Sequence, residues 1–92
     1  MKATASGHPF RIELGRHIVA DSGICGAQPT FKGTRIMVNA VLDLVAEGLD
    51  WDEIIHDCHD RISRPAIAEA IRLANRALVE RADEQRKRAA SA

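Results

Sequence analysis

The apolar and polar positions alternate near the N-terminus and change to a helical period in the middle of the chain. Residues 10–14, FRIEL, alternate strictly, which predicts a strand with one buried face. A turn at Gly15-Arg16 leads to a second β-prone segment at residues 17–20. Residues 24–38 supply a third extended stretch with a turn at 32–34, where glycine can adopt the positive φ that a tight turn needs.

Three helical segments are predicted to fill the rest of the chain. The first spans 40–47, with Asn39 as N-cap and Gly48 as a left-handed C-terminal residue. The second begins at Asp50, which forms a capping-box pattern with Glu53. Its apolar stripe follows the helical period and consists of Trp51, Ile54, Ile55 and Cys58.

The third helix is predicted to run from about residue 64 to about residue 82. Ser63 is a suitable N-cap, and Pro65 falls in the first turn, where a missing N–H costs little. The predicted inner face consists of Ile67, Ala70, Ile71, Ala74 and Leu78. The predicted outer face consists of Glu69, Arg72, Arg76 and Glu80.

These elements predict a single, mainly α domain at residues 10–82. It comprises a β element at 10–38 and a three-helix unit at 39–82, between a disordered leader (1–9) and a flexible basic tail (83–92). Two helices joined by a four-residue turn, with a third helix before them, have the layout of a helix-turn-helix domain. Three-helix units of this spacing also bind proteins, so the layout alone does not specify DNA.

Composition changes the picture in two respects. Apolar residues make up 46% of the 92 residues, but only three are aromatic, so the core is built from aliphatic side chains and is thin. We therefore expect oligomerisation. Two cysteines make no disulfide framework, and with neither a signal peptide nor a membrane-length apolar run, a cytoplasmic protein is expected.

The net charge of zero conceals a division along the chain. Residues 1–42 carry five Lys/Arg and two acids, residues 43–60 carry seven acids and no Lys/Arg, and residues 61–92 carry eight Lys/Arg and four acids. A neutral protein can bind nucleic acid when its basic residues share one face. A solvated surface of mixed sign is the alternative.

Three stretches resemble a known family. HIVADSGICGAQPTFKGTRIMV, VLDLVAEGLDWDEII and ISRPAIAEAIRLA are similar to the domain of unknown function 433 family over roughly residues 14–75. The resemblance implies a small homeodomain-like helix-turn-helix domain with an N-terminal β element. It also implies an antitoxin of a type II toxin–antitoxin module, paired with a PIN-like ribonuclease toxin. Ser22, Ala27-Gln28 and the ligand-rich stretch 56–60 depart from the family pattern.

That stretch raises the question of a metal site. His56, Cys58 and His59 are ligand-type residues. Cys58 belongs to the apolar stripe and is expected to point inward, whereas His56 lies two positions away, on another side of the helix. We therefore predict a buried thiol flanked by solvent-facing histidines, with no metal and no cofactor.

A catalytic arrangement of His17, Asp21 and Cys25 is also considered. A nucleophilic cysteine needs a base within hydrogen-bonding reach and a third orienting group. The sequence marks no pocket around these residues, and Cys25 is expected to pack as a small residue in the turn. The chain is not expected to be an enzyme.

The arginines of the third helix are the candidate DNA contacts: Arg64, Arg72 and Arg76. The N-terminal part of a recognition helix enters the major groove, where arginine binds guanine or phosphate. Glu69 and Glu80 are spaced to pair with the last two, so an ordinary salt-bridged helix surface is the rival interpretation.

A dimer built on the β segment is expected, because the strands at 10–14, 17–20 and 35–38 are short and their edges need partners. Arg35 could bind phosphate or cap the acidic helix end at 50–53 of another subunit, and the structural role is favoured. The residues assigned to structure or dimerisation are Gly33, Thr34, Arg35, Ile36, Val38 and Trp51.

The toxin contact is expected at about residues 78–88, where few large apolar residues remain and the basic excess lies. The candidate residues are Arg81, Arg86, Lys87 and Arg88. The function expected from the sequence is an antitoxin-like protein that neutralises its toxin and binds operator DNA as a dimer. The alternative is a protein-interaction module without DNA binding.

Overall fold

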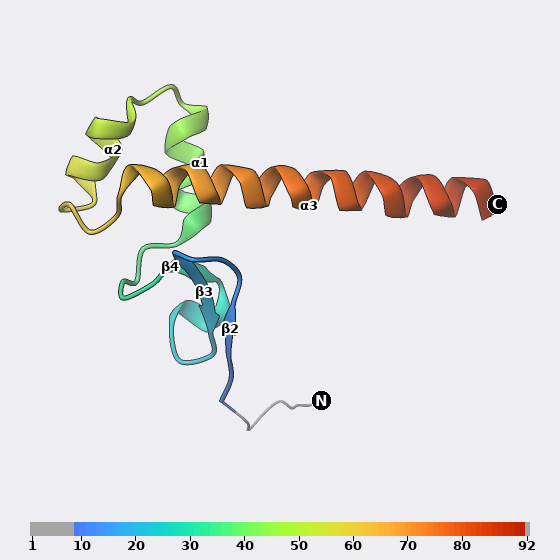
Figure 1. Ribbon diagram of the computed structural model, residues 1–92, viewed down its shortest axis with the longest axis horizontal. Coiled ribbons are helices and arrows are strands. Elements are labelled where there is room, and N and C mark those ends of the chain that lie inside the picture. Colours follow the sequence, from blue (N-terminus) through green and yellow to red (C-terminus); the bar gives the residue numbers. More distant parts are fainter. Residues whose placement is uncertain (1–8, 92) are drawn as a thin grey trace.

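A computed structural model describes residues 9–91. It consists of a small sheet followed by three helices (Figure 1). The elements in chain order are β2 (Arg11–Glu13), β3 (Ile18–Asp21), the short 3-10 turn η1 (Cys25–Ala27), β4 (Pro29–Phe31), α1 (Val38–Ala46), α2 (Trp51–Asp57) and α3 (Arg64–Ser91). The prediction of a mainly α fold with N-terminal strands is confirmed.

The sheet is antiparallel, in the order β2-β3-β4. Ile12 pairs with Ala20, and Ile18 pairs with Phe31, so these four side chains share one face of the sheet. The predicted strand at 35–38 is wrong. Only a single bridge between Thr30 and Met37 forms there, and the chain then enters α1, because the apolar period of 3.6 already begins at Val38.

The local signals at the ends of α1 and α2 behave as predicted. Gly48 follows α1 with a φ of 91°, and Asp50 and Glu53 form both halves of the capping box of α2. The N-cap of α1 is Met37, two residues earlier than the predicted Asn39. Gly33 has a φ of 77°, which fits the predicted turn between β4 and α1.

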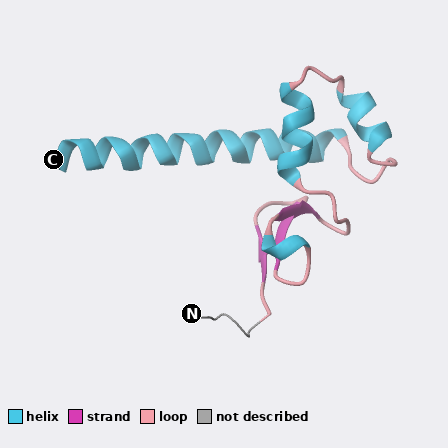
Figure 2. Ribbon diagram, turned by 180° about the vertical axis from the view of Figure 1, so that it is seen from behind, coloured by secondary structure: helices cyan, strands magenta, loops and turns pink. Residues whose placement is uncertain are grey.

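Helix α3 is longer than predicted. It continues to Ser91 instead of ending near Ala82, and its 28 residues span about 42 Å. Figures 1 and 2 show it crossing α1 and then extending away from all other elements. Ala, Glu, Gln, Arg and Lys dominate the sequence beyond Leu78, and these residues favour a helix even where nothing packs against it.

The hydrophobic core occupies only the first part of α3, against α1, α2 and the sheet. Its buried members are Ile18, Phe31, Val38, Val41, Ile54, Ile62, Ala66, Ile67 and Ala70. Ala74 and Leu78, predicted for the inner face of α3, are exposed, because α1 crosses α3 and α2 lies near the start of α3 (Figure 1). No helix in the described part of the chain is both long enough and apolar enough to span a bilayer.

Two threonines, Thr30 and Thr34, are buried in this fold. The hydroxyl group of one has hydrogen-bond partners, and the hydroxyl group of the other has none among the described residues. The Thr34 hydroxyl donates to Phe31 O (2.8 Å) and accepts from Ile36 N (3.0 Å). The Thr30 hydroxyl is fully buried and has no partner among the described residues. We expect Thr30→Val to raise the free energy of unfolding by about 1 kcal/mol and Thr34→Val to lower it by about 1–2 kcal/mol.

Urea denaturation of the two variants and the parent measures both changes. The substitutions are chemically identical and keep the β-branched shape, so the two threonines control for each other. Equal losses of stability in both variants would contradict the hydrogen-bond assignment.

Candidate functional site

The exposed half of α3 is the largest unpartnered element of the described chain. We call residues 74–91 the arm; it is about 27 Å long. Its two largest apolar side chains are open to solvent, with Leu78 68% and Val79 54% exposed. An isolated helix of this length is marginally stable in water, so an uncovered arm is suited to a partner's surface.

The arm has two different long faces. Its outer face follows the spacing of four and three residues that keeps side chains aligned. It consists of Arg76, Val79, Asp83 and Arg86, and Arg72 extends it toward the body of the protein. A second stripe of uncharged residues consists of Ala74, Leu78, Ala82, Gln85 and Ala89, of which only Gln85 is polar. The outer face is therefore mainly basic around one valine, whereas the stripe is uncharged.

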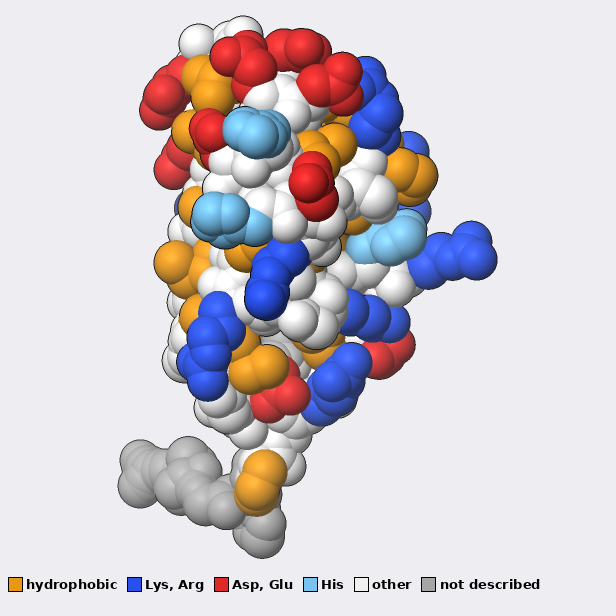
Figure 3. Space-filling model, turned by 90° about the vertical axis from the view of Figure 1, so that its left-hand side faces the viewer, with side chains coloured by type: hydrophobic (Ala, Val, Ile, Leu, Met, Phe, Trp, Pro, Cys, Tyr) orange, Lys and Arg blue, Asp and Glu red, His pale blue; other side chains and the backbone are white. Residues whose placement is uncertain are grey.

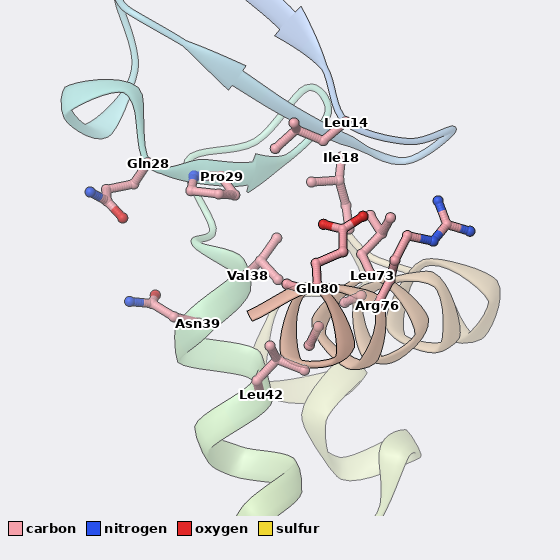
Figure 4. Close-up of a pocket in the computed structure, with 13 residues that line it drawn as sticks. Leu14, Ile18, Gln28, Pro29, Val38, Asn39, Leu42, Leu73, Arg76 and Glu80 are labelled. Carbon is pink, nitrogen blue, oxygen red and sulfur yellow. The ribbon is translucent and has the colours of Figure 1, made fainter. Parts of the chain in front are cut away.

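An apolar groove lies where the arm leaves the body of the protein. Its volume is about 480 Å³, and Figure 4 shows its three walls, formed by the sheet, α1 and α3. Leu14 and Pro29 line it from the sheet side, Leu42 from α1, and Leu73 from α3. Four polar or charged side chains also line it: Gln28, Asn39, Arg76 and Glu80.

The apolar surface continues from the groove along β2. The alternation at 10–14 predicts a buried face, but in the structure Phe10 is 46%, Ile12 51% and Leu14 41% exposed. That prediction is wrong for the single chain, because the helices cover Ile18 and Phe31 and do not reach the outermost strand. We call this surface, together with the groove, the apolar corner.

Glu69 holds the turn between β2 and β3. The prediction that it lies on the outer face of α3 is wrong. One carboxylate oxygen accepts from Arg16 N (2.8 Å), and the other accepts from His17 N (2.7 Å). Burial acts to raise the pKa of Glu69, but the two amides outweigh it, and the pKa is lower than usual. The sequence does contain a signal for this position. Glu69 adjoins the inner face of α3, which carries the buried Ala66 and Ala70, so its carboxylate can reach the body of the protein.

Arg64, a predicted DNA contact, lies in a different environment from the other arginines. Its guanidinium is 2.5 Å from Asp52 and lies over the Trp51 ring, 5.4 Å from the centroid. These contacts join the first turn of α3 to the first turn of α2. Arg64 therefore ties two helices together, and Trp51 lies half-buried against the core.

Acidic side chains surround this end of the molecule. Figure 3 shows them gathered at the top of the view, where α1 ends and α2 lies, with Lys and Arg side chains farther down. Residues 43–60 carry seven acids and no Lys or Arg. A DNA backbone approaching the first turn of α3 would meet this negative surface, so the charge distribution opposes groove reading by Arg64.

The other basic candidates are spread along α3. Arg72 and Arg76 are exposed near the groove, and Arg81, Arg86, Lys87 and Arg88 lie on the arm. Arg86 forms an ion pair with Asp83 one turn earlier. The structure therefore places the predicted toxin contacts together on one helix and separates them from Arg64.

Apart from Trp51, which begins α2, the residues assigned to structure or dimerisation lie in the connection from β4 to α1 and at the start of α1. Gly33 and Thr34 make the turn, Ile36 packs against the core, and Val38 is buried. The side chain of Arg35 is exposed, and its carbonyl accepts a 3.5 Å hydrogen bond from the Cys25 thiol.

The histidine and cysteine candidates have ordinary structural surroundings. Burial raises the pKa of the Cys58 thiol, and the nearby Asp57 raises it further, so the thiol stays protonated. Within residues 9–91 no three His, Cys, Asp or Glu side chains are grouped so as to hold a metal ion. Asp21 accepts from Gly23 N (2.8 Å), and Cys25 donates to Arg35, so neither is oriented toward His17.

Comparison with known proteins identifies the family. The model of a family described as proteins of unknown function, DUF433, matches residues 18–74, more than half of the chain. The chain belongs to the DUF433 family. No curated protein and no solved structure matches it significantly. The DUF433 match covers most of the groove walls and ends at residue 74, so β2 and the arm beyond its first residue lie outside it.

Proposed function

We propose that this DUF433 protein is an antitoxin-like protein of a type II toxin–antitoxin module, which binds and neutralises a PIN-like ribonuclease toxin in the cytoplasm. The observation that carries the proposal is the arm, a helix that the rest of the described residues leave largely exposed and that has a basic outer face around the exposed Val79. A helix of this kind is suited to docking in a partner's groove.

The charge of the arm supports a partner with an acidic surface. The arm carries five Lys/Arg, among them Arg81, Arg86, Lys87 and Arg88, against three acids, which gives it a basic excess. A PIN-like ribonuclease carries carboxylates at its metal site, and a basic helix is electrostatically complementary to them. The acidic α1–α2 end lies at the other end of α3, so it does not oppose this contact.

Charge reversal on the arm tests the toxin contact. We expect Arg86→Glu to weaken binding of the toxin encoded beside this gene by about tenfold, because it places a negative charge opposite an acidic surface. Arg61→Glu is the matched control, since Arg61 is also exposed but lies in the turn before α3. Titration calorimetry and rescue of growth under toxin expression measure the effect. Equal affinity of both variants and the parent would refute the contact.

Operator binding is the second component of the proposal. Arg72 and Arg76 support it, because both are exposed one turn apart on α3. A mobility-shift assay with the chain's own promoter, at two salt concentrations, tests it, since phosphate contacts weaken steeply with salt. A protein that rescues growth but shifts no DNA is an interaction module without DNA binding.

A further inference from the structure

We infer that the apolar corner and the uncharged stripe of the arm bind a second copy of this chain, in an antiparallel dimer in which each arm covers the corner of the other. The inference goes beyond the proposed function, which concerns the outer face of the arm. It rests on three observations: the uncovered face of β2, the sequence of the stripe, and the available area.

The first observation is the conflict between the pattern of β2 and its exposure. Phe10, Ile12 and Leu14 alternate with charged residues as in a strand with one buried face, yet each is more than two-fifths exposed. They continue the surface of the groove, whose walls are mainly apolar. An apolar surface that runs over two elements is typical of an interface.

The second observation is that the stripe matches itself when the chain direction is reversed. Its members, at 74, 78, 82, 85 and 89, are separated by four, four, three and four residues, which is nearly the same order from either end. A two-fold axis near Ala82 therefore places Leu78 beside Gln85 of the second copy, and Ala74 beside Ala89. Interfaces between two identical chains require this self-complementarity.

This arrangement also brings the arm to the corner. With the axis near Ala82, the last turn of one arm lies opposite Ala74 of the other copy, and Ala74 is one of the residues that line the groove. Figure 4 views the groove along α3 and shows Leu14 and Glu80 on opposite sides of it. The small side chains of Ala89 and Ala90 allow a helix to approach these walls closely.

The third observation is the area. At about 150–200 Å² for a fully exposed residue of this size, the exposed parts of Phe10, Ile12, Leu14 and Leu78 amount to about 380 Å² per copy. A stable interface needs about 800 Å² per partner. These four side chains supply nearly half of that area, and an arm about 27 Å long and about 10 Å wide supplies the remainder.

Light scattering and sedimentation at micromolar concentration test the dimer. The parent is expected to have twice the 10.1 kDa mass of one chain. Leu78→Lys and Leu14→Lys are each expected to raise the dimer dissociation constant by about tenfold or more, because each buries a charge in the interface. Val79→Lys is the matched control, because Val79 is exposed on the same helix but lies outside the stripe.

A cross-linking experiment tests the position of the axis. In a chain with Cys25→Ser and Cys58→Ser, a short bismaleimide is expected to join two copies through Ala82→Cys and not through Val79→Cys. A monomeric parent, or equal effects of Leu78→Lys and Val79→Lys, would overturn the inference. If the parent is monomeric and Leu14→Lys weakens toxin binding, the corner binds the toxin and not a second copy. A dimer that binds no toxin supports the inference and refutes the proposed function.

Discussion

Ile67→Ala is expected to lower the free energy of unfolding by about 3 kcal/mol, because it removes three heavy atoms from a site that cannot collapse around the cavity. Ile67 has no exposed surface and packs in the core between α1, α2 and the sheet. A domain of this size has a total stability of about 5–10 kcal/mol, so one substitution removes a large part of it.

Val79→Ala is the matched control for that substitution. Val79 is on the same helix, twelve residues later, but is 54% exposed and lies outside the proposed dimer stripe. We expect a change below about 0.5 kcal/mol. Urea denaturation at one fixed protein concentration measures both, since dimer stability depends on concentration. Similar losses in the two variants would mean that α3 is held along its whole length and that the arm is not free.

The features of the fold that depend on local chemistry were predictable from the sequence. The capping box at Asp50 and Glu53 and the positive φ of Gly48 follow from side-chain hydrogen bonds and backbone sterics within a few residues. The structure of the segment at 35–38 was not predictable from the sequence, because Ile36, Met37 and Val38 are compatible with both a strand and a helix. Packing of Val38 against the core decides between them.

The candidate surfaces were predictable only in part. The basic residues of the arm were found because charge accumulates after residue 78, but the end of the helix was placed too early. Helix propensity continues to Ser91, whereas the apolar period stops at Leu78, so the period predicts an earlier end than the propensity does. The exposure of the apolar face of β2 was not predictable. An alternating pattern indicates that one face of a strand is buried, but it does not indicate which chain covers that face.

The turn between β2 and β3 should depend on pH through Glu69. Its pKa is lower in the folded chain, so ionised Glu69 stabilises the fold above the unfolded-state pKa of about 4.3, and that contribution is lost as the pH falls through the folded-state pKa. We expect Glu69→Gln to lose about 1–2 kcal/mol at pH 7, because an amide offers only one acceptor to the two N–H groups. The difference in unfolding free energy between Glu69→Gln and the parent should become smaller below about pH 4.

Glu84→Gln is the control for the charge, since Glu84 is exposed on the arm of the same helix. Urea denaturation of the parent and the two variants measures the dependence between about pH 3 and about pH 7, below and well above the ordinary glutamate pKa of about 4.3. A Glu69→Gln variant that loses as much stability at low pH as at neutral pH would contradict the role of the carboxylate.

Gly15 provides an independent test of the same contact. A Cβ atom at this position would lie 2.7 Å from the Glu69 carboxyl carbon and 2.8 Å from both of its oxygens. At a site with a compatible backbone, Gly→Ala stabilises a protein by about 0.4–1 kcal/mol, because it lowers the conformational entropy of the unfolded chain. At Gly15 the new methyl group must instead displace the Glu69 carboxylate, which accepts hydrogen bonds from two backbone N–H groups. We therefore expect Gly15→Ala to destabilise the parent by about 1 kcal/mol or more.

The same substitution should reverse its effect once the carboxylate is absent. In a Glu69→Ala background the clash disappears, and Gly15→Ala should be neutral or stabilising, so the two substitutions are strongly non-additive. A double-mutant cycle by urea denaturation gives the coupling free energy directly. If Gly15→Ala costs the same in both backgrounds, its effect comes from the turn itself, and Glu69 does not hold the sheet to α3.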